Sequence, residues 1–116
     1  MPKFMMILHD SMPDLAKISP AEMQRVIAKY QAWSAKLGQA GKLAGGEKLK
    51  DEGGKHITAT KGKMVVRDGP FAEAKELVGG YFTIEAADYT EATALCADCP
   101  HLELGGRVEL REIDPM

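Results

Sequence analysis

Asp68 is the first side chain whose type and place in the sequence could support chemistry. It opens an Asp-Gly-Pro turn (residues 68–70) between two β-like runs. A carboxylate on such a turn could act as a general base in a cleft, with Glu47 or Lys75 positioning it. The same carboxylate could instead cap its own turn by bonding the backbone two residues on. The sequence favours the cap, because Asp-Gly-Pro turns well without chemistry, and keeps the general base as the functional hypothesis.

His9 is the second candidate, at the end of the first predicted strand. A histidine facing a cleft there could shuttle protons near pH 7. If Asp68 or Glu47 lies within hydrogen-bond reach, the two would form a His/acid pair. Asp10 follows His9 directly, and neighbouring residues of a strand point to opposite faces, so we do not expect these two to be partners. The alternative is a hydrogen-bonded structural histidine.

Aromatic side chains could line a small apolar pocket at a subunit interface, or some of them could belong only to the core. The candidates are Tyr30, Trp33, Phe71 and Tyr81. With the charged groups near the turn, the predicted substrate-binding set is Glu47, Lys75, Tyr81, Trp33 and Tyr30.

Cys96 and Cys99 form a CxxC motif, but its setting is unfavourable for redox or metal chemistry. The motif lies at the C-terminal end of a predicted helix, whereas reactive thiols favour an N-terminus. Zinc would need further ligands, and His101 with His9 or His56 are the histidines available. We therefore interpret both cysteines as small residues on an apolar helix face, and we expect no metal and no cofactor.

The elements that must position these residues follow from local patterns. Residues 3–9 predict a strand with apolar side chains on both of its faces. Ser19-Pro20-Ala21-Glu22 begins a helix that ends at Gly38 or Gly41. A short strand follows over 42–47. Residues 56–60 and 63–67 predict a hairpin with Lys61-Gly62 as its turn. A strand over 80–85, a helix from Asp88 until Pro100 stops it, and a strand over 106–113 complete the order.

This order, β-α-β-β-β-α-β, predicts an α+β ferredoxin-like fold in a single domain over residues 1–116. Two crossover helices would cover one face of the sheet, yet the first strand is apolar on both. We therefore expect a second copy to pack against the open face, which gives a homodimer with a dimeric α+β barrel.

The last strand has one polar phase whose direction the sequence leaves open. Arg107, Glu109 and Arg111 alternate with apolar residues, and an earlier strand carries Tyr81, Thr83 and Glu85. Inside the barrel these groups would line a polar cavity suited to a small charged metabolite. On the outside they would form an ordinary cross-strand charge ladder.

Composition narrows the function classes. The chain has 116 residues, 28% of them charged, and a net charge of −2. That charge argues against nucleic-acid or anionic-membrane partners, because these bind proteins through a basic surface. No apolar run approaches the roughly 20 residues of a membrane span, and the N-terminal run is too short for a signal peptide. Cytoplasmic location follows as an expectation.

An ordered set of motifs resembles the YCII-related proteins, and within them the DGPF-domain branch. The set comprises the opening Met-Met-Ile-Leu (5–8), residues 40–47, the Asp-Gly-Pro-Phe tetrapeptide (68–71) with its Glu-x-Lys-Glu continuation (73–76), Gly-Gly-Tyr (79–81) and the closing strand 108–111. The resemblance covers nearly the whole chain and implies a ferredoxin-like dimeric barrel. It also implies acid/base activity of a His/Asp pair in a cleft. Here the first predicted helix has no histidine, and its ring-bearing candidate is Tyr30.

Two functions are open at this point. The first is binding of a small polar metabolite at a dimer-interface cleft, with cofactor-independent acid/base chemistry by Asp68 and His9. The second is a non-enzymatic interaction module for an extracytoplasmic-function sigma factor, as the resemblance to the DGPF branch implies. Charged groups gathered at a glycine-rich turn favour the first.

Overall fold

The computed structural model describes residues 1–11, 19–69 and 76–116. Its elements follow the predicted order, with one short helix added. They are β1 (Lys3–Ser11), α2 (Pro20–Gln39), β2 (Leu43–Lys48), β3 (Lys55–Thr60), β4 (Lys63–Asp68), β5 (Glu76–Glu85), α3 (Tyr89–Cys96), α4 (Pro100–Glu103) and β6 (Arg107–Glu112). None of the helices within these described residues is long and apolar enough to cross a membrane.

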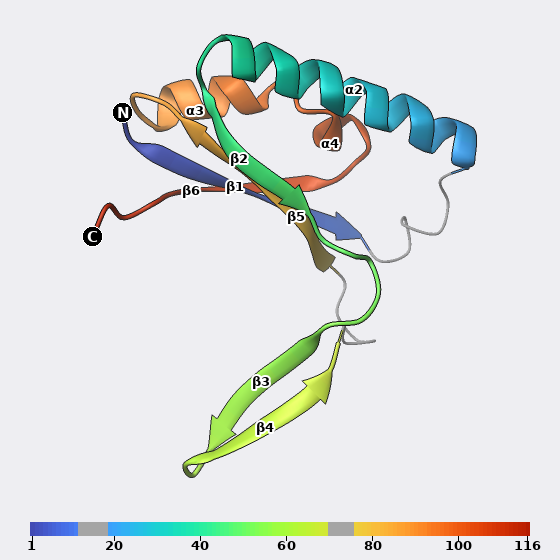
Figure 1. Ribbon diagram of the computed structural model, residues 1–116, viewed down its shortest axis with the longest axis vertical. Coiled ribbons are helices and arrows are strands. Elements are labelled where there is room, and N and C mark those ends of the chain that lie inside the picture. The colour runs from blue at the N-terminus through green and yellow to red at the C-terminus, as the bar shows by residue number, and fades with distance from the viewer. Residues whose placement is uncertain (12–18, 70–75) are drawn as a thin grey trace.

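Four strands form one antiparallel sheet in the order β2-β5-β1-β6. The helices lie together on one face of this sheet, and the opposite face carries none of the described helices (Figure 1). We call that opposite surface the open face. Two crossover helices on one side of an antiparallel sheet confirm the predicted ferredoxin-like α+β fold.

The core lies between the sheet and the helices. Phe4 and Met6 of β1 are fully buried there, and Trp33 and Leu37 of α2 pack against them. Burying a side chain of this size stabilises the fold by about 1.5–3 kcal/mol. Ile7, on the alternate phase of β1, faces the open side, so the predicted two-sided apolar strand is present.

Helix boundaries follow the capping residues at their N-terminal ends. Ser19 Oγ accepts a hydrogen bond from Glu22 N (3.2 Å), and Asp88 Oδ1 accepts one from Glu91 N (2.9 Å). The predicted stop at Pro100 is wrong. The helix α3 ends at Cys96, and Pro100 begins α4, because proline is well placed in a first helical turn.

The hairpin of β3 and β4 is a separate two-stranded sheet that projects away from the body of the molecule (Figure 1). We call residues 55–68 the arm. Its turn is the predicted Lys61-Gly62, where both residues have positive φ (52° and 78°), as a two-residue hairpin turn of type I′ requires. The arm makes the chain extended: its radius of gyration is 16.1 Å, against about 13 Å for a compact domain of this length.

Candidate functional site

A cavity of about 640 Å³ lies between α2 and the end of the sheet where β1 and β2 finish and β5 begins. Its apolar lining is Leu8, Met23, Ile27, Tyr30, Phe82 and Leu104, and its polar lining is Asp10, Gln31, Ser34, Glu47, Lys48, Asp51 and His101. Gly46, Gly79 and Gly80 complete the wall. A large apolar surface with a few polar groups on one side is typical of small-molecule sites.

Asp10 and His101 form an acid/imidazole pair in this wall. His101 Nδ1 lies 3.6 Å from Asp10 Oδ1, and the two side chains are only 5% and 22% exposed. The other ring nitrogen, Nε2, lies 2.9 Å from the carbonyl oxygen of His9. A carbonyl oxygen only accepts, so Nε2 must carry a proton and donate it.

That hydrogen bond leaves Nδ1 as the ring nitrogen that can exchange a proton with Asp10. In the neutral imidazole Nδ1 is an acceptor, and it would then face a carboxylate that is also an acceptor. One proton between the two groups removes this conflict. Burial raises the pKa of the Asp10 carboxyl, and the nearby His101 and Lys48 charges partly oppose that rise. The pair is therefore suited to taking up and releasing a proton.

Two glycines make room for the pair. A Cβ atom on Gly79 would lie 2.0 Å from Asp10 Oδ2, and one on Gly106 would lie 2.3 Å from His101 Nε2. Gly79 is also the extra residue of a bulge in β5: Leu8 of β1 pairs with Gly80 and His9 pairs with Val78, so the register skips Gly79. Residues 79 and 106 thus lack side chains where the acid and the imidazole need the space.

His9 lies on the open face, away from this cavity. Its Nε2 lies 2.9 Å from Glu109 Oε1, and its side chain is 14% exposed. The expectation that His9 and Asp10 are not partners is confirmed. The acid beside His9 is Glu109 rather than Asp68 or Glu47, because β6 pairs with β1.

Asp68 lies at the base of the arm and outside the cavity lining. Its side chain is 84% exposed and forms an ion pair with Lys55 Nζ across the two strands. Pro70, Phe71 and Lys75, the remainder of the predicted turn and site, lie outside the described residues.

The predicted binding residues are divided among three places. Tyr30 lines the cavity, stacked on Phe82 at 6.3 Å between ring centroids, and burial raises the pKa of its phenol. Trp33 is in the core, where its Nε1 donates to Leu95 O (3.3 Å). Glu47 borders the cavity from β2, but its side chain shares a face with its strand partner Tyr81. Tyr81 pairs with Ile7 on its other side, which places Tyr81 and Glu47 on the open face.

The polar phase of β6 also faces the open side. Glu109 and Arg111 pair with Ile7 and Met5, while Val108 and Leu110 pack against the core. The open face therefore has an apolar centre on β1 flanked by charged and polar side chains.

Sequence reasoning missed Asp10 and His101 as a site. The predicted first strand ends at residue 9, but β1 continues through Asp10, whose side chain shares a face with the buried Phe4, Met6 and Leu8. A carboxylate at a strand position whose neighbours on the same face are buried is the signal that could have identified Asp10. His101 is placed by α4, the short helix between α3 and β6, which no local pattern predicts.

Cys96 and Cys99 are free thiols, both buried in the core. Burial raises the pKa of the Cys96 thiol to about 11 and also raises that of Cys99. Within the described ranges no three His, Cys, Asp or Glu side chains are grouped as a metal site would need.

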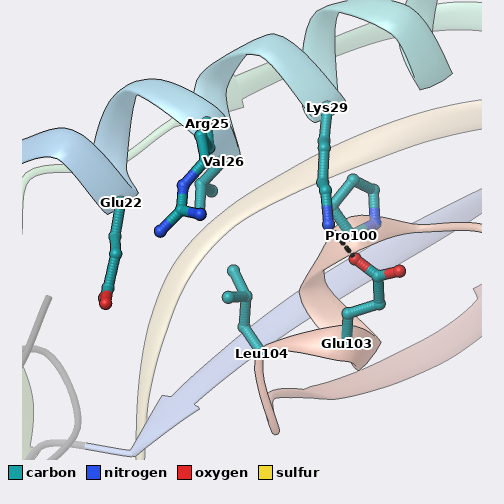
Figure 2. Close-up of a pocket in the computed structure, with 7 residues that line it drawn as sticks. All are labelled: Glu22, Arg25, Val26, Lys29, Pro100, Glu103 and Leu104. Carbon is teal, nitrogen blue, oxygen red and sulfur yellow. Dashed lines mark hydrogen bonds and ion pairs between the residues drawn. The ribbon is translucent and has the colours of Figure 1, made fainter.

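A second, smaller hollow of about 220 Å³ lies between α2 and α4. Figure 2 shows Val26 and Leu104 in it, with Lys29 bonded across it to Glu103 (Nζ–Oε2 2.8 Å). Both charged side chains are largely exposed, so this ion pair contributes about 0–1 kcal/mol. The hollow marks where α4, and His101 with it, docks against α2.

Comparison with known proteins identifies relatives without a described activity. A family model of the YCII-related domain matches residues 3–116. An uncharacterized protein of Rhizobium meliloti (strain 1021) is 33% identical over 81 residues, which are 69% of this chain and 65% of the relative. The matched part thus spans just under two thirds of the relative's length.

Proposed function

The chain belongs to the YCII-related family, and we propose that it binds a small molecule in the cavity beside α2 and transfers a proton on it with Asp10 and His101. The observation that carries this proposal is the half-buried Asp10–His101 pair at 3.6 Å in the wall of a cavity of about 640 Å³. The narrower assignment to the DGPF branch rests on the tetrapeptide at residues 68–71.

We assign the acid/base role to Asp10 rather than Asp68. Asp68 is exposed to solvent, is paired with Lys55 and lies outside the cavity lining, so it has no enclosed site in which to meet a ligand. Asp10 is partly desolvated and faces a histidine whose other nitrogen is fixed by the His9 carbonyl. Such a setting is how proteins adapt a carboxyl group to proton transfer near neutral pH.

The chemistry needs no more than a proton donor and acceptor. A ligand with an acidic C–H or O–H next to Asp10 would give its proton to the carboxylate, and His101 Nδ1 would hold or return it. The apolar lining from Met23, Ile27 and Phe82 favours a ligand with a larger apolar part than the polar metabolite expected from the sequence.

A fragment screen by protein-observed NMR tests this function. We expect small aromatic or aliphatic acids and enols to shift the amide signals of residues lining the cavity, with affinities weakened about tenfold or more by Asp10→Asn. Asp68→Asn makes the same chemical change on an exposed surface and should leave the affinities unaltered. Fragments that bind elsewhere, or bind equally to both variants, would contradict the proposal.

We also propose that the chain is a homodimer in which a second copy covers the open face. The support is the position of Met5 and Ile7, apolar side chains on a strand face that no described helix covers. The sigma-factor interaction module stays a separate prediction, and co-purification of a sigma factor with the chain at a fixed ratio is its test.

A further inference from the structure

Tyr30 carries a hydroxyl group for which the fold provides no partner. The residue lies in the wall of the cavity, with its ring stacked on Phe82 at 6.3 Å between centroids and 20° between planes. No hydrogen bond joins its hydroxyl to any other residue in the described part of the chain. Every buried polar side-chain atom in that part has a partner, so a hydroxyl without one must be open to solvent. The cavity therefore contains a group that is free to bond a ligand.

The Tyr30 hydroxyl is a hydrogen-bond donor and not a base. Burial raises the pKa of the phenol, and the nearby Cys99 and Asp10 groups add to that rise, so the phenol keeps its proton. The influence of Asp10 also means that the phenol and this carboxyl group lie near one another. A ligand in the cavity thus meets a proton acceptor at Asp10 and a hydrogen-bond donor at Tyr30.

The other donors in the cavity wall are less suited to this role. Lys48 Nζ is already paired with Asp51 Oδ1 at 2.9 Å, and its side chain is mostly exposed. Gln31 has a flexible side chain, and a serine within a helix, such as Ser34, can bond the backbone of the preceding turn. The stacked ring of Tyr30 holds its hydroxyl in place, so this donor is positioned before a ligand arrives.

A carboxylate base beside a fixed donor suits the removal of a proton from a carbon next to a carbonyl group. We propose that the Tyr30 hydroxyl binds the carbonyl oxygen of the ligand and stabilises the enolate that forms when Asp10 takes the proton. The C–H bond breaks, its proton goes to the Asp10 carboxylate, its electron pair forms a carbon–carbon double bond, and the carbonyl π electrons move to the oxygen. Return of the proton completes a keto–enol tautomerisation without any oxidant, reductant or co-reactant. The inference rests on the proposed function, because it needs Asp10 as the base.

This role of Tyr30 narrows the class of ligand. A donor aimed at an oxygen, next to a base for a carbon-bound proton, selects aldehydes and ketones over ligands whose acidic proton is on oxygen. The apolar lining from Met23, Ile27 and Phe82 selects an aromatic or branched aliphatic group on the same molecule. The expected substrate is therefore an enolisable carbonyl compound with an apolar substituent.

Binding of a matched pair of probes tests the hydroxyl. At a pH where 4-nitrophenol is ionised, it resembles a planar enolate, whereas 4-nitrotoluene has a methyl group in place of the oxygen. Tyr30→Phe removes the hydroxyl and keeps the ring, so we expect it to weaken 4-nitrophenolate binding about tenfold or more and to leave 4-nitrotoluene binding within about twofold. Tyr81→Phe makes the same change on the open face and should alter neither affinity. Equal losses for both probes, or no loss for either, would overturn the role of the hydroxyl.

Proton exchange separates this inference from the proposed function. NMR in deuterated water follows the loss of the hydrogens next to the carbonyl group of phenylacetone as the protein exchanges them. We expect Tyr30→Phe to lower kcat for exchange about tenfold or more with KM within about threefold, because the enolate needs the donor more than the ketone does. Exchange that Asp10→Asn abolishes and Tyr30→Phe leaves unchanged overturns the role of Tyr30 alone. A wild-type protein that does not exchange phenylacetone, or exchange that Asp10→Asn leaves unchanged, overturns the proposed function and this inference together.

Discussion

At the scale of single residues, the surroundings of a carboxyl group decide what it can do. Asp10 and Asp68 are the same residue type, each at the end of a strand. Asp10 is partly buried against His101, while Asp68 is 84% exposed beside Lys55. Burial raises the pKa of the Asp10 carboxyl, so this carboxyl is the one suited to proton transfer.

The buried cysteines give a prediction at this scale. Burial raises the pKa of the Cys96 thiol to about 11, so almost none of it is thiolate at pH 8. We expect 5,5′-dithiobis(2-nitrobenzoate) to label the native protein about 100-fold more slowly than the urea-unfolded chain. Labelling of both thiols at the rate of the unfolded chain would show that the motif is exposed and would contradict the core assignment.

At the scale of elements, the site forms where backbone segments lie close to the side chains of Asp10 and His101. The end of β1 supplies Asp10, α4 supplies His101, and glycines on β5 and before β6 leave the space that both need. The site therefore depends on the backbones of four segments as much as on its two functional side chains.

Alanine at these glycines should separate the pair without unfolding the protein. A Cβ at residue 79 would collide with Asp10, and one at residue 106 would collide with the His101 ring. We expect Gly79→Ala and Gly106→Ala each to weaken ligand binding in the cavity by about tenfold or more. Gly45→Ala is the control, since its Cβ would meet no atom within 4 Å.

Heteronuclear NMR spectra and binding titrations of the three variants provide the check. Equal effects of Gly45→Ala and Gly79→Ala would mean that general strand stability, rather than the position of Asp10, controls binding.

Sequence alone predicted the elements well where the signals were local. The cap at Ser19, the Lys61-Gly62 turn and the two-phase apolar strand all act within a few residues, and each is confirmed. The break between Cys96 and Pro100 was missed because proline can end one helix or begin the next.

The site was harder to predict because its pairs are distant in the chain. His101 meets Asp10, and Glu109 meets His9, only after β6 has paired with β1. The register between strands decides such contacts, and no local pattern reports it. The tetrapeptide marks Asp68 as a candidate, and the structure places Asp68 at the base of the arm, outside the cavity lining.

At the scale of the whole molecule, the chain has surfaces that it does not cover itself. The body is a sheet with helices on one side, and the arm extends beyond it with an apolar face (Figure 1). The arm has four basic residues and one acidic residue, so the rest of the chain, whose overall net charge is −2, is acidic.

Salt provides a test at this scale. If the proposed homodimer brings basic arms against acidic bodies, raising the NaCl concentration from about 50 mM to about 500 mM should weaken it several-fold, because ions screen the attraction. Sedimentation equilibrium at a series of salt concentrations measures this. A dimer that tightens as the salt concentration rises would be held by apolar contacts alone, and that result would contradict a contribution from charge.

The most direct test of the central claim is an NMR titration of the Asp10 carboxyl carbon in the wild type and in His101→Gln. Burial raises the Asp10 pKa and the His101 charge lowers it, so we expect a midpoint above the ordinary 3.8 that rises further in His101→Gln. The folded state would then hold the Asp10 proton at pH values where the unfolded chain has lost it, and stability would fall as pH rises through that window. An Asp10 midpoint at or below 3.8, unchanged by His101→Gln, would show that the two groups do not share a desolvated site and would contradict the proposed function.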